Sequence, residues 1–405
     1  MEFKPRLVAM PLVVTLLMLI APVINPYIVG IVVILLSIIL YTIHKTHYLA
    51  ISVAILALLY GIGFIPVIAF LGPLMMMVWG EYLARVLRDY SPETLAFAIG
   101  AVLGIVATMF RCMEIDSLVA IIAVVVLLML RSILVDREDA GMIGLLGVAM
   151  TITLFFDLEF TYDATMLALA VVVCAGFAYF AYRAKTVDAS GVFAAVLFGI
   201  ILITFAGVPW FLVVISFFIL GSFFTKYRYA EKVFLGVEQE KSGRRGYMNA
   251  FANALVGVAG AILFGLTGNE IFTALFLGCI ATATADTLAS EIGVTGGTPY
   301  LITTLRPVPA GTNGGVTVLG ELACLFGALI ICGIAFLLEV APWYVCLIGI
   351  AAGVFGTNMD SLIGALIENK GVIGNSGTNL LATLSGGLFA MVVYWICTTA
   401  ATLLL

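Results

Sequence analysis

Long apolar stretches follow one another along almost the whole chain, with short polar connections between them. Of the 405 residues, 63% are hydrophobic and only 10% are charged, whereas about a quarter of the residues of a soluble domain are charged. A chain with so few charges cannot cover a surface that faces water, so lipid must surround most of it. The stretches are longer than barrel strands and do not alternate, and each is therefore predicted as a helix that satisfies its own backbone hydrogen bonds.

The sequence predicts an all-α protein, a polytopic transmembrane helical bundle of about fifteen spans, each near the ~20 apolar residues that a bilayer requires. The first run, from Leu7, follows Lys4 and Arg6 and has no small-residue cleavage site, so it is predicted as a span and not as a signal peptide. The expected spans are residues 7–24, 28–43, 48–63, 67–84, 94–110, 117–134, 140–155, 164–182, 190–206, 210–225, 250–266, 270–287, 315–338, 343–366 and 378–404.

Basic residues fall mostly on alternate connections, with Arg111 as the exception. By the positive-inside rule these connections are cytoplasmic, so the N-terminus is predicted to be cytoplasmic and the C-terminus to lie outside. The same rule places the three longest polar connections of the C-terminal half, 226–249, 288–314 and 367–377, on one side. We therefore expect an integral protein of the cell membrane with a site that faces the cytoplasm.

Composition also excludes some functions. No long basic stretch is present, so no nucleic acid is expected as a partner. The chain has two histidines, His44 and His47, too few for a typical zinc site. Its seven cysteines form no C-x-x-C pair and lie mostly in apolar runs, as small buried residues do.

Polar residues inside or beside the apolar runs are concentrated in the C-terminal half. Eight of the nine asparagines lie at or after Asn249, and the acids Asp286 and Asp360 at the edges of predicted spans lie there too. The sequence thus predicts two domains. Residues 1–160 form an N-terminal transmembrane bundle of unassigned role, and residues 161–405 form a second transmembrane domain that is expected to carry the function.

A first candidate stretch places Arg244 and Arg245 between glycines, just before a predicted helix. Glycine lets backbone N–H groups approach an anion, and arginine binds phosphate in a bidentate manner. Cations of this stretch, Lys226 among them, are also explained by membrane topology alone. Lys241-Ser242 resembles the end of a P-loop, but Glu240 replaces the required glycine and no strand precedes it, so that motif is rejected.

A second candidate, at the end of a predicted span, contains Asp286, Ser290 and Glu291 at positions i, i+4 and i+5, on roughly one helix face. Carboxylates this close to hydrocarbon are costly and are usually functional. Their oxygens suit Mg²⁺, which one or two carboxylates commonly hold together with phosphate oxygens. The alternative is an acid that only caps the helix.

A third candidate is a glycine-rich loop at the start of a predicted helix, five residues after Arg306. Such a loop can bind an anion through its backbone N–H groups, although an ordinary connection is also rich in Pro and Gly. Its residues are Gly311, Thr312, Asn313, Gly314 and Gly315.

A fourth candidate lies inside a predicted span, where Asp360 and Ser361 stand one to two turns before its end. An unpaired carboxylate is costly there and requires a metal, an amide or a basic partner. The nearby Gly353, Gly356 and Gly364 are explained by close helix packing. The tripeptide Gly-Thr-Asn, which occurs in this candidate and the third, appears three times, at residues 311–313, 356–358 and 377–379.

These motifs resemble the integral-membrane family that contains the plant phytyl-phosphate kinase and transmembrane protein 19. The resemblance is carried by Ala-Asp-Thr-x-Ala-Ser-Glu-x-Gly at 285–293, Pro-x-Gly-Thr-Asn-Gly-Gly at 309–315 and Asp-Ser-Leu-x-Gly at 360–364. It covers about residues 165–405. Thr-Leu-Ala at 287–289, where the family more often has an aromatic residue after the threonine, and Glu368, near a frequent amide, depart from the family pattern.

The resemblance implies a Mg²⁺-dependent membrane kinase that transfers a phosphoryl group from CTP, or another nucleoside triphosphate, to an isoprenoid monophosphate of the phytyl or geranylgeranyl type. On this hypothesis Asp286, Glu291 and Asp360 are the catalytic and metal-binding carboxylates. The residues expected to bind nucleotide or phosphate are Lys226, Arg244, Arg245, Asn249, Asn253, Arg306, Gly311, Thr312, Asn313, Gly314, Gly315, Asn358, Ser361, Asn375 and Asn379.

Two other hypotheses remain open. One is a prenol kinase or a cytidylyltransferase that acts on a related lipid. The other is a transporter or flippase with an ion-coupled polar site, because many spans and acids near the midplane also suit a carrier. The polar groups crowd toward one side and the two halves show no convincing repeat, which favours an enzyme. The partners expected are membrane lipid, the isoprenoid phosphate and a nucleotide; the sequence indicates no oligomeric state.

Overall fold

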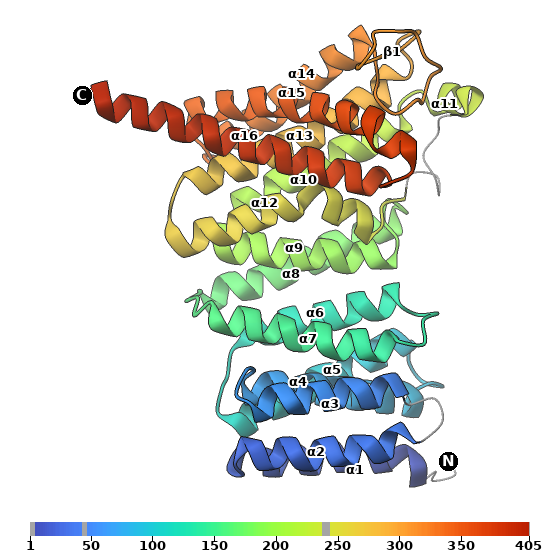
Figure 1. Ribbon diagram of the computed structural model, residues 1–405, viewed down its shortest axis with the longest axis vertical. Coiled ribbons are helices and arrows are strands. Elements are labelled where there is room, and N and C mark those ends of the chain that lie inside the picture. The colour runs from blue at the N-terminus through green and yellow to red at the C-terminus, as the bar shows by residue number, and fades with distance from the viewer. Residues whose placement is uncertain (1–4, 43–46, 237–243, 405) are drawn as a thin grey trace. The chain divides into compact units, whose positions relative to one another are not determined.

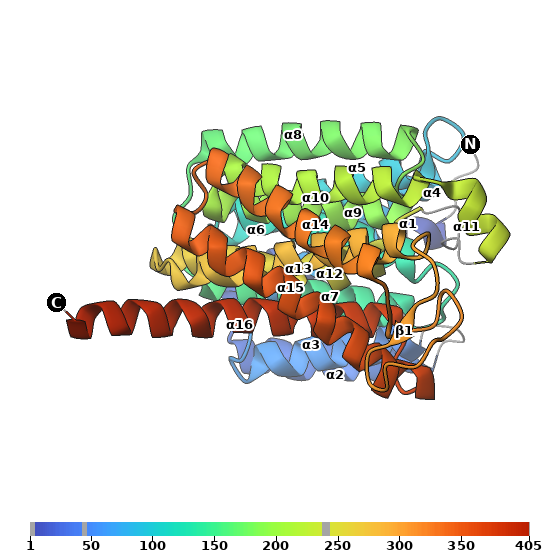
Figure 2. The same cartoon turned by 90° about the horizontal axis from the view of Figure 1, so that it is seen from above.

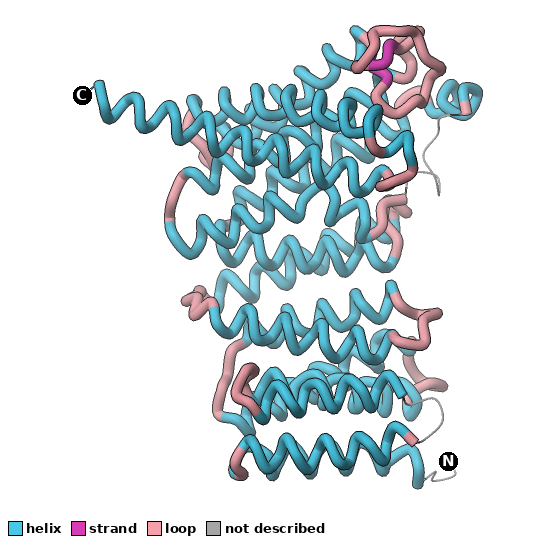
Figure 3. Tube along the Cα trace, in the orientation of Figure 1, coloured by secondary structure: helices cyan, strands magenta, loops and turns pink. Residues whose placement is uncertain are grey.

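The computed structural model describes residues 5–42, 47–236 and 244–404, and most of these residues are helical (Figure 3). Outside the described residues lie Lys4, His44, Lys45 and the segment Glu240-Lys241-Ser242. The chain divides into two compact units, residues 1–161 and 162–405.

The first unit consists of helices with short connections between them. Its helices are α1 (Pro5–Ile20), the 3₁₀ turn η1 (Ala21–Val23), α2 (Pro26–Tyr41), α3 (His47–Gly61), α4 (Val67–Val86), α5 (Glu93–Cys112), α6 (Ser117–Ile133) and α7 (Ala140–Asp157). Helices α4 and α5 pack closely because Gly104 brings the α5 backbone against Met75, where a Cβ would lie 2.6 Å from the Met75 carbonyl. Arg131 of α6 forms ion pairs with Glu81 and Glu93 and ties three helices together.

The second unit is built from longer helices and one small pair of strands. Its helices are α8 (Ala164–Arg183), α9 (Ala189–Ala206), α10 (Val208–Lys226), α11 (Tyr229–Leu235), α12 (Tyr247–Thr267), α13 (Ile271–Gly293), α14 (Val318–Leu337), α15 (Trp343–Leu366), η3 (Glu368–Lys370) and α16 (Asn375–Leu404). Strands β1 (Tyr300–Leu301) and β2 (Gly315–Val316) pair antiparallel in the loop between α13 and α14, with Tyr300 opposite Val316.

Eleven helices in the described part of the chain are long and apolar enough to cross a membrane, and four further apolar helices are shorter. The prediction of an all-α, polytopic membrane bundle is therefore confirmed. Several boundaries differ by a few residues, and the largest difference is at α13, which continues to Gly293 although its span was predicted to end at residue 287. The extra turns persist because Leu288 and Glu291 are both buried against the rest of the unit.

Helix α13 is the centre of the second unit. It packs against α10, α12, α14, α15 and α16, and Figure 1 shows it among these helices. Small residues permit the close approach: Gly353 of α15 faces Ala281, and Gly356 faces Thr282. The predicted packing role of these glycines is confirmed, and it brings the polar ends of α13 and α15 together.

The polar connections of the second unit share one end of its helices. Both views in Figures 1 and 2 show α11 and the loop with β1 at the same end, whereas the C-terminal end of α16 projects from the opposite end. The connection after α15 is there as well, because the Nδ2 of Asn369 donates a hydrogen bond of 3.0 Å to the carbonyl of Asn313. A single site built from these connections is therefore geometrically possible.

Candidate functional site

Two aspartates meet where α13 and α15 lie side by side. Gly356 packs on Thr282, so one turn further along each helix Asp360 and Asp286 lie on the facing surfaces. Their carboxyl groups are close enough to interact electrostatically. The structure thus brings together the two acids that the sequence singled out at the edges of spans.

A glutamate that was not predicted as a ligand joins this pair, and a second glutamate contacts α15. Glu368 of η3 interacts electrostatically with both Asp286 and Asp360, and its Oε2 accepts a 2.7 Å hydrogen bond from Thr378 of α16. Glu321 in the first turn of α14 accepts a 3.3 Å hydrogen bond from the amide of Asn358. We call Asp286, Asp360 and Glu368, whose carboxyl groups interact with one another, the acidic cluster.

The acidic cluster lacks a basic partner among the described residues. Oδ1 of Asp360 is buried and has no hydrogen-bond partner there, which is costly for a carboxylate. Mutually repelling carboxylates with an unsatisfied oxygen suit a hard cation such as Mg²⁺. No three His, Cys, Asp or Glu side chains in the described part of the chain come together closely enough to hold a metal alone, so phosphate oxygens and water would complete the coordination.

The glycine-rich loop rests directly on α15 beside this cluster. Gly314 has φ of +80°, and a Cβ built on it would lie only 2.6 Å from the carbonyl oxygen of Ser361 and from the Cβ of Ala365. Only glycine fits at this point. Ile302 donates a 2.9 Å backbone hydrogen bond to the Gly314 carbonyl, which holds the loop in place. The third and fourth sequence candidates, with Ser361 and Asn313, therefore form one site.

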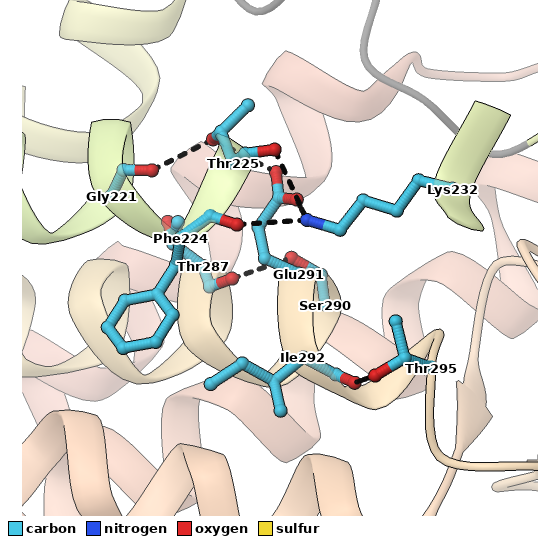
Figure 4. Close-up of polar contacts among 9 residues, drawn as sticks. All are labelled: Gly221, Phe224, Thr225, Lys232, Thr287, Ser290, Glu291, Ile292 and Thr295. Carbon is cyan, nitrogen blue, oxygen red and sulfur yellow. Dashed lines mark hydrogen bonds and ion pairs between the residues drawn. The ribbon is translucent and has the colours of Figure 1, made fainter. Parts of the chain in front are cut away.

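Glu291 lies in a different environment, shown in Figure 4. It is 5% exposed, and its Oε2 is 2.5 Å from Nζ of Lys232, while its Oε1 is 3.1 Å from the Thr225 hydroxyl. Five residues along a helix rotate a side chain by about 140° from its starting direction, so Glu291 and Asp286 point to different neighbours. The expectation that they share one face requires correction, since Glu291 is held in an internal ion pair.

Arg245 is also part of the interior. It is 7% exposed, and its guanidinium lies over the rings of Phe217 and Phe218. Backbone hydrogen bonds with Thr186 and Asp188 fix its position. Burial lowers the pKa of Arg245 to about 10, and the charge of Glu291 counters this effect. Arg245 therefore stays charged near neutral pH, but it does not face a ligand as the sequence reading expected.

The remaining predicted residues fall into two groups. Asn253 is buried and donates a 2.8 Å hydrogen bond to the carbonyl of Asn249 within α12, so its amide serves the helix. The others are exposed or partly exposed at the polar end of the unit: Lys226, Arg244, Arg306, Gly311, Thr312, Gly315, Asn375 and Asn379. Their exposure leaves these side chains and loop residues accessible to a ligand.

The profile of the integral membrane protein family DUF92 matches residues 171–387, which lie entirely in the second unit. The chain belongs to the DUF92 family. The resemblance inferred from the motifs is thereby confirmed, and the match contains the acidic cluster and the glycine-rich loop. No solved structure matches the chain.

Three curated relatives each match about half of the chain. An uncharacterized membrane protein of Methanocaldococcus jannaschii is 35% identical over 220 residues, which cover 52% of this chain and 87% of that protein. The chloroplastic protein VTE6 of Arabidopsis thaliana is 31% identical over 190 residues, which cover 45% of this chain and 57% of VTE6. Protein PGR of the same plant is 34% identical over 232 residues, which cover 51% of this chain and 80% of PGR.

Proposed function

We propose that the second unit is a Mg²⁺-dependent membrane kinase that transfers the terminal phosphoryl group of a nucleoside triphosphate to an isoprenoid monophosphate. The observation that carries the proposal is the pairing of Asp286 with Asp360, whose buried Oδ1 is unsatisfied, beside a glycine-rich loop. The motif resemblance to the plant phytyl-phosphate kinase supports the substrate class and CTP as donor.

The proposed reaction is balanced by the two substrates alone. An oxygen of the isoprenoid monophosphate forms a bond to the terminal phosphorus of the nucleotide, and the bond from that phosphorus to the bridging oxygen breaks. The products are the isoprenoid diphosphate and a nucleoside diphosphate. Such a transfer asks the protein mainly to position the phosphates and to neutralise their charge.

The residues present divide this work between them. Asp286 and Asp360 would hold Mg²⁺, with Glu368 close to both. Bound Mg²⁺ neutralises the negative charge that develops on the phosphates. The backbone of the loop at Asn313 and Gly314 and the exposed Arg306 would bind phosphate oxygens. Glu291, which the sequence also suggested as a ligand, has no part in this proposal because it forms an ion pair with Lys232.

An isoprenoid substrate fits the membrane setting. Its hydrocarbon chain would remain among the lipid-facing helices while its monophosphate reaches the polar end of the unit. The spans around the cluster expose large apolar side chains to lipid, for example Leu322 and Phe326 on α14. A lipid substrate therefore needs no passage through water to reach the cluster.

The test is a direct assay on purified full-length protein in nanodiscs. Prenyl monophosphates of several chain lengths are incubated with Mg²⁺ and each of CTP, ATP, GTP and UTP, and isoprenoid diphosphate is measured. The proposal expects diphosphate with at least one pair. Parallel reactions use prenols as acceptors and detect transfer of CMP, and sealed vesicles report movement of lipid phosphate across the bilayer. Transfer of CMP, phosphorylation of prenols only, or lipid movement without diphosphate would replace the proposal by the corresponding alternative.

A further inference from the structure

Helix α11 has its lysine inside and its large apolar residues outside, while its Glu231 is ion-paired with Arg228. Of its seven residues Lys232 alone is buried, at 2% exposure, while Phe234 is 88% exposed and its neighbours Val233 and Leu235 are also exposed. In water this arrangement is unfavourable twice, because a charge is removed from solvent and an aromatic ring is presented to it. The pattern makes sense if the outer face of α11 meets lipid.

The inward lysine is firmly held. Nζ of Lys232 is 2.5 Å from Oε2 of Glu291 and donates hydrogen bonds to the carbonyls of Phe224, at 2.9 Å, and Thr225, at 3.3 Å (Figure 4). Those carbonyls belong to the last turn of α10, so Lys232 also satisfies acceptors that a helix end leaves open. The ion pair thus fixes which face of α11 points outward.

The helix that precedes α11 has an exposed apolar stripe that leads toward it. Ile219 and Phe223 of the spanning helix α10 are both exposed, four residues apart on one face, and Tyr227, the next in that series, is exposed at the start of the turn into α11. Phe234 follows within eight residues. Aromatic and apolar residues in such a position are typical of the membrane–water interface.

Charge at this end of the unit agrees with a lipid surface. The connection after α8 and the end of α10 carry exposed cations, and Arg244 is a further one. Basic residues at this level attract anionic lipid headgroups by about 1 kcal/mol each. These residues are Arg183, Lys185, Lys226 and Arg244.

We infer that α11 lies in the interfacial layer of the bilayer, with Phe234 among the upper parts of the lipid chains and Lys232 turned inward onto Glu291. The inference does not depend on the proposed function. It does bear on it, because Asp286 precedes Glu291 by five residues on the same helix, about 7 Å along its axis. The acidic cluster would then lie just beneath the headgroups, at a depth that a lipid phosphate can reach.

The experiment measures the depth of single spin labels in full-length protein in nanodiscs of phosphatidylcholine and phosphatidylglycerol. Cys112 and Cys397, the two thiols that are not buried, are first replaced by serine. Labels are placed at Phe234→Cys and, as a second position, at Val233→Cys. Phe223→Cys on α10 is the lipid-facing control, and Thr304→Cys in the exposed loop between β1 and β2 is the aqueous control.

Oxygen collects in lipid and a nickel chelate stays in water. The ratio of the oxygen collision rate to the nickel collision rate therefore rises with the depth of the label in the bilayer. We expect the ratio at position 234 to resemble that at 223, with somewhat more nickel contact, and to exceed that at 304. A ratio equal to that at 304 would overturn the inference, since α11 would then lie in water. An immobilised label that neither reagent reaches would overturn it too, because protein would then cover this face.

Discussion

Two acidic residues on one helix, Asp286 and Glu291, have opposite surroundings. Asp286 shares its side of α13 with the carboxyl groups of Asp360 and Glu368. Glu291 lies against Lys232 and Thr225, with the cation of Arg245 also close enough to interact. The site around Asp286 contains only carboxyl groups. At the site around Glu291, which we call the balanced site, the chain itself supplies the cations.

The difference shows what decides the role of a carboxylate near a membrane. A carboxylate that is paired with a cation of the same chain contributes to the fold. Breaking such a buried pair usually lowers the stability by more than the intact pair raises it. Acids that face each other without a basic side chain are stabilised by a bound cation or by a proton, so their arrangement favours a role in binding or proton transfer. Adjacency in a sequence motif does not distinguish these cases, whereas the partners do.

The largest effect is expected at the acidic cluster. Asp286→Asn or Asp360→Asn should lower phosphoryl transfer by about a thousandfold, because the amide keeps the shape and loses the charge that Mg²⁺ requires, a change of several kcal/mol in transition-state stabilisation. Without Mg²⁺ the unfolding temperature should stay the same or rise, since one repelling charge is removed. Activity and thermal unfolding are measured on the same detergent-purified preparations.

This pair of measurements separates binding from structure. A purely structural role would survive the substitution, because asparagine keeps the size and the hydrogen-bonding capacity of aspartate. Activity near that of the wild type in both variants would mean that the two aspartates are structural, and the proposed site would be lost.

A second large effect, on stability, is expected at the balanced site. Glu291→Gln leaves two buried cations, Lys232 and Arg245, without their anion, and should destabilise the protein by about 3 kcal/mol. Lys232→Met should cost less, because Glu291 keeps Arg245 as a partner. Thermal unfolding in one detergent gives the order of the variants.

Thr225→Val is the matched control for this order, since it removes the hydroxyl that contacts Glu291 and the Gly221 carbonyl but leaves all the charges in place, and it should cost about 1.5 kcal/mol. The three variants should bind Mg²⁺ as the wild type does. If Glu291→Gln were as stable as the wild type and instead needed much more Mg²⁺ for activity, Glu291 would return to the metal site.

The spans and the two aspartates could be predicted because both are visible in the hydrophobicity pattern of the sequence. An apolar run identifies α15 at Trp343–Leu366 from the sequence, and an acid inside such a run is conspicuous because its burial is costly. Glu321 was missed because an acid in the first turn of a helix is already explained by the helix dipole. Its partner Asn358 is known only once α14 and α15 are packed.

The balanced site was not predictable for a related reason. Lys232 lies in a polar connection, where a lysine is ordinarily explained by membrane topology. Helix α11 has only seven residues, too few for a recognisable apolar period. Strands β1 and β2 have two residues each within a Pro- and Gly-rich loop and carry no strand pattern. Each feature depends on contacts between segments distant in the sequence.

A smaller effect is expected when the first unit is removed. The acidic cluster and the balanced site are both formed by residues of the second unit, and the first unit contributes none of the residues in either. A chain starting at Tyr162 should therefore retain activity within about tenfold of the full chain, a difference of about 1.4 kcal/mol. Assays on a folded, monodisperse truncation test this; complete loss of activity would show that the first unit is required for catalysis.

The smallest effect is expected where the glycine-rich loop meets α15. Gly314→Ala adds a methyl group that would contact the carbonyl oxygen of Ser361, so the loop must move away from α15 and from Asp360. We expect the KM for the nucleotide to rise about fivefold, near 1 kcal/mol of lost binding, with kcat little changed. Gly297→Ala is the control, because Gly297 also has positive φ, at +93°, but has open space around it. Both variants carry the backbone strain of alanine in this conformation, and only Gly314→Ala displaces the loop. Equal KM values in the two would indicate that the loop does not bind the nucleotide.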